Sequence, residues 1–369
     1  MEKYSLTTIK EFDGNRKNNF TALRIIFAWC VLYGHSYSIQ RLAGITDPLN
    51  IFVFKGSTWI GEVSLDSFFA ISGFLVSASF MKRGLADYTI SRILRIFPAL
   101  IVCVFLTVFV LGPILTNLHI NEYFSKHETI QYLTNALAYP LTEWSLPGVF
   151  KTNANGAVNG SLWSLSLEIR CYILLAIAGF FGLLKNRTIA NIFLLAVFVF
   201  GVYFFQSIPL IGINIHWAKS SMYFLAGVFF YLNRDDVVLD LKIAIFLLIL
   251  SVYSFGKAFF NFVFPVGLVY LVFYTVYETR YLPVDSEIGD ISYGIYIYAW
   301  PVQQIVAQAL PKATPYANTL FSSIFVVMIA YASWRYIEKP MLSLKAKLFA
   351  VNISDFIYAI DSVVRKVSG

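Results

Sequence analysis

The sequence of 369 residues is 58% hydrophobic and only 13% charged, and its mean hydropathy is +0.68. This composition excludes an ordinary soluble domain, in which about 25% of residues are charged, and indicates a membrane protein. The formal net charge of +7 is typical of the basic inner loops of such proteins, so we expect no nucleic acid partner.

The first nineteen residues form a largely polar segment that includes Lys3, Lys10, Arg16 and Lys17. No cleavable signal peptide is visible there, and we expect this segment to stay in the cytoplasm.

Ten apolar runs follow, and we predict an all-α, polytopic integral membrane protein with about ten transmembrane helices. Lys and Arg residues gather in the loops that this count puts on the inner side, which predicts that both termini are cytoplasmic. All three cysteines fall within apolar runs, where free thiols act as small hydrophobes, so we expect neither disulfides nor a metal site. The predicted spans lie near residues 20–39, 59–81, 97–118, 163–184, 189–208, 216–232, 241–256, 258–278, 292–310 and 318–338.

The first span carries two ionisable side chains, Arg24 and His35. Eleven residues separate them, which gives three helical turns plus about 20° and a rise of about 16.5 Å. They therefore share one helix face, with Arg24 near the inner end and His35 near the outer end. An ionisable residue at this depth indicates a functional site. The alternatives are that Arg24 extends to the inner headgroups and that His35 is a hydrogen-bonded histidine at the outer interface.

The second span contains Asp66 and, at its middle, Ser72 and Gly73. A carboxylate within apolar sequence needs a cationic or hydrogen-bonding partner, and His35 is the partner that we predict. Small residues such as Ser72 and Gly73 also allow close helix packing, which is the alternative to a role in binding.

Arg92 and Arg95 lie three residues apart, on one helix face, just before Pro98, which we expect to start the third span. Paired guanidinium groups suit the phosphates of a cytosolic ligand, although juxtamembrane arginines also anchor topology.

A long loop, residues 119–162, leads to the fourth span, and we expect it to fold over the outer mouth of the bundle. The fourth span contains Glu168 and Arg170, which point in different directions on a helix and so need different partners. Trp163 and Tyr172 in the same span can be explained as interfacial and packing aromatics.

The ninth span contains Tyr293, Tyr296, Tyr298 and Pro301, and also two amides. Paired amides either line a polar cavity or bond across helices. These amides are Gln303 and Gln304. The tenth span ends in WRYIEKP, whose Glu338 and Lys339 can be structural.

Taken together, these segments resemble the acyltransferase 3 family, integral-membrane enzymes that O-acetylate bacterial surface polysaccharides, O-antigen and nodulation factors. The matching segments cover most of residues 18–341 in the family's order. They are LRIIFAWCVLYGHS, VSLDSFFAISGFLV, SRILRIFPAL, NGSLWSLSLEIRCYILL, ISYGIYIYAWPV and YIEKP. Two positions depart from the pattern, because Ala299 stands where many members have histidine and Ile169 replaces a second acidic residue.

The resemblance implies a membrane acyltransferase domain at residues 1–345 and a short cytoplasmic tail at 346–369. It implies transfer of an acyl group, most often acetyl, from cytosolic acyl-CoA to a hydroxyl of a cell-surface or lipid-linked saccharide. The reaction would take place at the outer face of a bacterial inner (plasma) membrane. A glycan or lipid transporter is the alternative, although no inverted repeat is visible between the two halves of the chain.

The resemblance also assigns candidate residues. His35 would act as general base, with Asp66 or Glu168 holding its tautomer, and a transient acyl-histidine is the alternative mechanism. The residues expected to bind acetyl-CoA or another acyl-CoA donor are Arg24, Arg92 and Arg95. Those expected to contact substrate are Ser72, Trp163, Arg170, Tyr296 and Gln303.

Overall fold

The computed structural model describes residues 7–345 apart from residues 13, 16, 42–44, 139–141, 205 and 207–213; the side chains of 201–203 are also not described. This part of the chain contains helices and no strand, with one isolated bridge between Thr8 and Val238. The all-α prediction is confirmed. The predicted tail at 346–369 and the first six residues lie outside the described residues.

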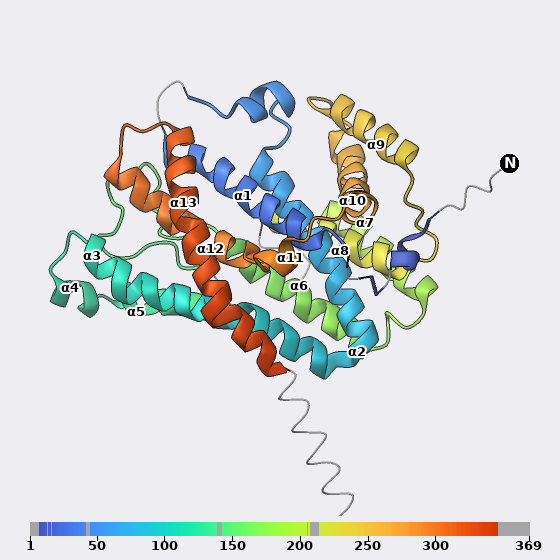
Figure 1. Ribbon diagram of the computed structural model, residues 1–369, viewed down its shortest axis with the longest axis horizontal. Coiled ribbons are helices and arrows are strands. Elements are labelled where there is room, and N and C mark those ends of the chain that lie inside the picture. Colours follow the sequence, from blue (N-terminus) through green and yellow to red (C-terminus); the bar gives the residue numbers. More distant parts are fainter. Residues whose placement is uncertain are drawn as a thin grey trace, which may run out of the picture.

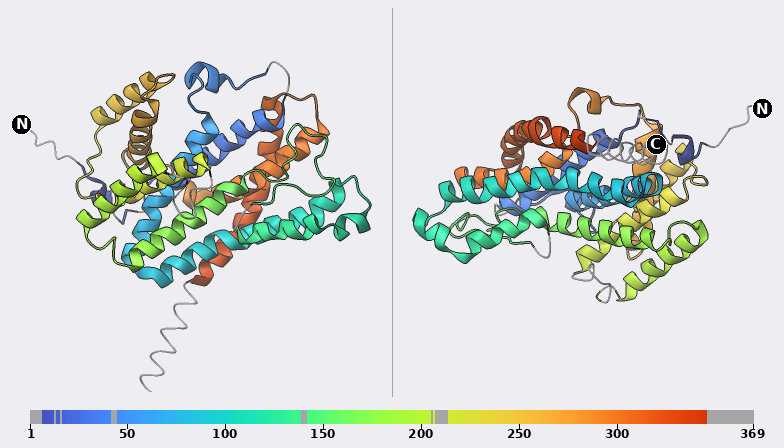
Figure 2. Two further views of the ribbon diagram at one scale, coloured as in Figure 1. Left: turned by 180° about the vertical axis from the view of Figure 1, so that it is seen from behind. Right: turned by 90° about the horizontal axis from the view of Figure 1, so that it is seen from below.

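The helices form one bundle, and the C-terminal part of α2 runs along its length (Figures 1 and 2). The long helices are α1 (Phe20–Ile39), α2 (Ile60–Leu106), α6 (Leu162–Phe180), α7 (Arg187–Phe204), α8 (Ile215–Leu232), α9 (Leu241–Ser254), α10 (Phe260–Glu278), α12 (Ser292–Ala309) and α13 (Pro315–Ser333). The short ones are η1 (Ile9–Phe12), η2 (Leu49–Val53), η3 (Thr107–Leu111), α3 (Gly112–Leu115), α4 (Ile120–Ser125), α5 (His127–Gln131), η4 (Tyr132–Leu137), α11 (Val284–Glu287) and η6 (Trp334–Glu338).

Each of the ten predicted spans coincides with a helical segment, and the first span matches α1 at both ends. Within the described part of the chain, four helical stretches are long and apolar enough to cross a membrane, namely 60–115, 162–180, 260–278 and 315–345. The helical, membrane character of the chain is therefore supported, whereas ten crossings and the side of each terminus stay predictions.

The second and third predicted spans are two arms of the single element α2, which bends at Gly84. Gly84 has φ +77° and ψ 178°, a non-helical conformation that suits glycine and kinks the helix. In Figure 1 the blue arm descends to the bend and the cyan arm runs back towards α3. The prediction that Pro98 starts the third helix is wrong, because the second arm begins directly after Gly84 and Pro98 lies inside it.

Capping side chains determine where several helices begin. Asn214 accepts a hydrogen bond from the backbone N–H of Trp217 at the start of α8, and Asp240 accepts two at the start of α9. Thr314 caps α13, whose first residue is Pro315, a residue with no N–H to satisfy. These caps satisfy backbone groups that have no partner inside the helix.

Two packing contacts hold the candidate site together. The first arm of α2 packs on α8 through glycines, because a Cβ on Gly73 would clash with the backbone oxygen of Phe224, and one on Gly227 with that of Ala70. On the other side, α1, α12 and α13 share a separate apolar cluster that contains Leu32. The site lies where these two packed groups meet.

The long loop packs against α12 between Ile297 and Gln304. Asn153 donates to Gln304 Oε1 at 2.8 Å, Asn159 donates to the backbone oxygen of Ile297 at 2.9 Å, and Trp300 Nε1 donates to Ala157 O at 2.9 Å. The loop therefore covers one end of the bundle, the end that carries His35.

Candidate active site

A cavity of about 390 Å³ lies between α1, α2, α6, the start of α12 and the segment after η6. This volume is typical of small-molecule sites. Among the described residues, five cationic side chains and only two carboxylates line it, which favours an anionic ligand. The charged and hydroxyl-bearing residues of the lining are Arg24, Ser72, Arg83, Ser91, Arg92, Arg95, Ser164, Glu168, Tyr172, Asp290, Ser292, Tyr293, Tyr296 and Lys345.

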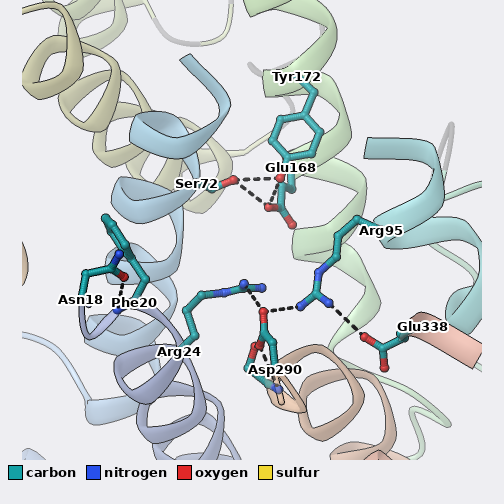
Figure 3. Close-up of polar contacts among 10 residues, drawn as sticks. Asn18, Phe20, Arg24, Ser72, Arg95, Glu168, Tyr172, Asp290 and Glu338 are labelled. Carbon is teal, nitrogen blue, oxygen red and sulfur yellow. Dashed lines mark hydrogen bonds and ion pairs between the residues drawn. The ribbon is translucent and has the colours of Figure 1, made fainter. Parts of the chain in front are cut away.

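At one end of the cavity, four charged side chains form what we call the inner cluster (Figure 3). Arg24 and Arg95 both donate to the Oδ2 of Asp290, the second of them at 2.8 Å, and Arg95 also donates to Glu338 Oε2 at 3.2 Å. Burial alone would raise the pKa of Asp290, which precedes the α12 span, but the two guanidinium groups outweigh it and the pKa lies below its ordinary value. The inner cluster thus holds two positive and two negative charges.

Glu168 is held by two hydroxyl groups (Figure 3). Ser72 Oγ and Tyr172 OH both donate to Glu168 Oε1, the first at 2.8 Å, and the two hydroxyl oxygens lie 2.8 Å apart. Ser72 therefore faces the cavity and connects α2 to α6, while its neighbour Gly73 packs against α8. Gly73 thus provides the close helix packing, whereas a role of Ser72 in binding stays a prediction.

Arg92 is the cavity arginine that forms no ion pair with any described residue. Its guanidinium carbon lies 5.8 Å from the ring centroid of Tyr172, and its Nε is buried with no hydrogen-bond partner in the described part of the chain. A positive charge held over an aromatic face in this way remains available to an anion.

Beside the bend of α2, three residues form what we call the bend cluster. Asp87 Oδ1 accepts from Lys345 Nζ at 2.8 Å and lies 3.1 Å from Arg83 Nε. Arg83 and Lys345 both line the cavity. The bend cluster thus holds two positive charges and one negative charge.

His35 lies away from this cavity lining, between two tryptophans. Its ring centroid is 4.7 Å from that of Trp300 and 5.9 Å from that of Trp59. Its Nδ1 is buried and has no hydrogen-bond partner among the described residues. Arg24 and His35 both face protein, as the spacing predicts, but the apolar residues Ala28 and Leu32 are buried between them.

The predicted pairing of Asp66 with His35 is wrong. Asp66 Oδ1 accepts from Ser220 Oγ at 2.9 Å, and its Oδ2 lies 3.9 Å from Lys219 Nζ. Lys219 also donates to Glu62 at 2.7 Å. His35 was predicted because it lies in the span that precedes Asp66, whereas the folded chain supplies a cation and a hydroxyl from α8.

Three other predicted substrate contacts lie outside the cavity lining. Arg170 is buried with its guanidinium carbon 4.8 Å from the ring centroid of Trp217, so it does face away from Glu168 as expected. Gln303 donates to the backbone oxygen of Leu32 at 2.8 Å and bonds across helices. Trp163 packs against the main apolar core.

The cavity brings together six of the predicted residues: Arg24, Ser72, Arg92, Arg95, Glu168 and Tyr296. The prediction from sequence did not include Asp290 or Lys345 in the site. It also treated Tyr172 as a packing aromatic, although its hydroxyl donates to Glu168. Asp290 directly precedes a predicted span, and its charge, opposite to that of the arginines expected at the same surface, could have identified it. Nothing local to Lys345 points to the cavity, which it reaches only through the fold.

A family profile described as an acyltransferase domain matches residues 17–335 of the chain. The chain belongs to the acyltransferase 3 family. The match includes every predicted site residue, and it covers the lining of the cavity apart from Leu342 and Lys345. The protein is accordingly an acyltransferase.

Two curated relatives match this acyltransferase 3 protein over most of their length. It is 29% identical over 354 residues to an O-acetyl transferase of Shigella phage Sf6, a match that covers 89% of this chain and 97% of the relative. It is 24% identical over 383 residues to Nodulation protein 10 of Rhizobium leguminosarum bv. viciae, covering 93% and 98%. No solved structure is significantly similar to the chain.

Proposed function

We propose that this acyltransferase moves an acetyl group from cytosolic acetyl-CoA to a hydroxyl of a surface or lipid-linked saccharide at the outer face of a bacterial inner membrane. The similarity to an O-acetyl transferase over most of the chain supports acetyl as the acyl group. The excess of cationic side chains in the cavity is the observation that carries the assignment of the donor, because CoA is rich in phosphate.

The donor's phosphates would bind at Arg92 and near the inner cluster, where Arg24 and Arg95 are already oriented by Asp290. Arginine suits this task because its planar guanidinium group can donate two hydrogen bonds to one phosphate. To reach His35, the flexible arm of CoA would have to pass the buried residues Ala28 and Leu32 over about 16.5 Å of helix rise along α1.

His35 would act as general base. Its imidazole takes the proton of the sugar hydroxyl while that oxygen attacks the thioester carbonyl, the carbon–sulfur bond breaks, and the CoA thiolate leaves and receives a proton. The unpartnered Nδ1 of His35 supports this role, because an imidazole nitrogen without a protein partner can accept one from substrate. Glu168, tied to Ser72 and Tyr172, would position the donor rather than the imidazole.

The test is acetyl transfer by purified full-length protein in nanodiscs, followed by mass spectrometry of the glycan acceptor and by CoA release. We expect His35→Ala to lower the rate about 10²–10⁴-fold, the usual contribution of a general base, while acetyl-CoA still binds. His216→Ala is the matched control, because His216 is exposed at the start of α8. Equal rates for His35→Ala and the control would refute the role of His35 as general base. If the intact protein transfers no acetyl group, the alternative of a transporter is favoured.

A further inference from the structure

The segment after η6 forms part of the cavity wall. Leu342 and Lys345 line the cavity, although the family profile ends at residue 335. This part of the wall lies beyond the match, and its role has to be argued from its own contacts.

The cationic side chains of the cavity are not all paired with carboxylates. The inner cluster has as many carboxylates as cations, whereas the bend cluster has two cations for the one carboxylate of Asp87. Arg92 forms no ion pair with a described residue. Surplus positive charge therefore lies at two places on the second arm of α2, at Arg92 and at the bend.

The distance between these two places is short. Asp87 and Arg92 are five residues apart on one helix, a rise of about 7.5 Å. CoA carries its phosphates in two groups, a diphosphate within the chain and a phosphomonoester on the ribose, joined through a single sugar. Two neighbouring sites of positive charge match this arrangement.

We propose that the bend cluster binds the 3′-phosphate of the CoA donor, with Lys345 as the residue that determines specificity for it. The inference rests on the proposed function, since it assumes that CoA is the donor. A phosphomonoester carries about −1.5 to −2 charge near neutral pH, more than the single carboxylate of Asp87, so it can draw Lys345 and Arg83 away from that carboxylate. Lys345 already lines the cavity, so its ammonium group lies beside any phosphate bound there.

The experiment compares two donors on one protein. Full-length protein in nanodiscs of phosphatidylcholine is titrated with acetyl-CoA and with 3′-dephospho-acetyl-CoA, and the dissociation constants are measured by calorimetry. The variants are Lys345→Ala and Lys345→Gln, with Lys339→Ala as the matched control from the same segment. Lys339 is exposed and does not line the cavity.

We expect the intact protein to bind acetyl-CoA roughly tenfold more tightly than the dephospho donor, the lower end of what a charge-assisted hydrogen bond contributes. Both Lys345 variants should lose this preference while their affinity for the dephospho donor stays within about twofold, and Lys339→Ala should keep it. Retained binding of the dephospho donor also shows that the variants are folded.

Other outcomes overturn the inference in distinguishable ways. Equal binding of both donors by the intact protein, or an equal loss for both donors in Lys345→Ala, would remove the phosphate site but leave the proposed function. If the intact protein binds neither donor, both the phosphate site and the proposed function are refuted. An anionic lipid headgroup offers the same phosphate chemistry, so the titration is repeated with phosphatidylglycerol added. A Lys345→Ala effect that occurs only in those bilayers would assign the bend cluster to lipid.

Discussion

At the scale of single residues, Arg92 differs from the other arginines of the cavity in having no carboxylate partner among the described residues. Arg24 and Arg95 share Asp290, and Arg83 contacts Asp87. A charge that is already neutralised has to exchange partners before it can bind a ligand, whereas Arg92 does not. It should therefore contribute most to donor affinity.

We predict that Arg92→Ala raises the KM for acetyl-CoA by roughly tenfold or more and changes kcat much less, because a charge-assisted bond to phosphate is lost. Arg92→Lys should recover part of this loss, since lysine keeps the charge but not the paired donors. Initial rates over a range of acetyl-CoA concentrations give both constants. Arg335→Ala, at an exposed arginine outside the lining, is the control. An Arg92→Ala enzyme with a lower kcat and an unchanged KM would contradict the phosphate role.

The sequence predicted the arginines of the site better than their partners. Arg24, Arg92 and Arg95 were recognisable because charges stand out in or beside apolar sequence. Asp290 and Glu338 lie 195 or more residues further along the chain than Arg95, and only the packing of α12 and η6 beside α2 brings them together. Sequence spacing predicts the face of one helix, but it contains no information on which helices are neighbours.

At the scale of elements, the contact between α2 and α8 depends on two glycines that face each other's backbone. Gly73→Ala would drive a methyl group into the backbone oxygen of Phe224, and backbone cannot move aside as a flexible side chain can. We predict a loss of stability of about 1–3 kcal/mol, the usual cost of overpacking, seen as a lower melting temperature in detergent. Gly156→Ala is the control, because its Cβ would meet nothing within 4 Å. A melting temperature for Gly73→Ala equal to that of the control would show that the helices separate without strain.

The lengths of the apolar runs predicted the helices, because a run of about twenty residues is long enough to cross hydrocarbon and must satisfy its own backbone. The boundary at Pro98 was wrong for a local reason. Proline is favoured in the first turn of a helix, but here the residues from Leu85 onward were already helical and Gly84 supplied the break. Polarity alone marked residues 82–96 as a loop, although residues 85–96 form part of the second arm.

At the scale of the whole molecule, α1 and α12 lie side by side in the same direction. Arg24 meets Asp290 at one end of the pair, and His35 meets Trp300 at the other. The cationic cavity lies at the first end, and the long loop packs at the second, where Trp300 donates to Ala157. Donor and acceptor would thus approach from opposite ends of one bundle, which is what transfer across a membrane requires.

This arrangement predicts the sidedness of two exposed lysines. Lys151, in the long loop, should face the outside, and Lys339, next to the cavity end, should face the cytoplasm. We expect a membrane-impermeant maleimide to label Lys151→Cys in intact spheroplasts and Lys339→Cys only after permeabilisation. The variants are made in a Cys30→Ser background, since Cys103 and Cys171 are buried, and that background alone serves as the unlabelled control. Labelling of Lys339→Cys in intact spheroplasts would put the cationic cavity on the outer side, where no acyl-CoA is supplied, and would contradict the proposed direction of transfer.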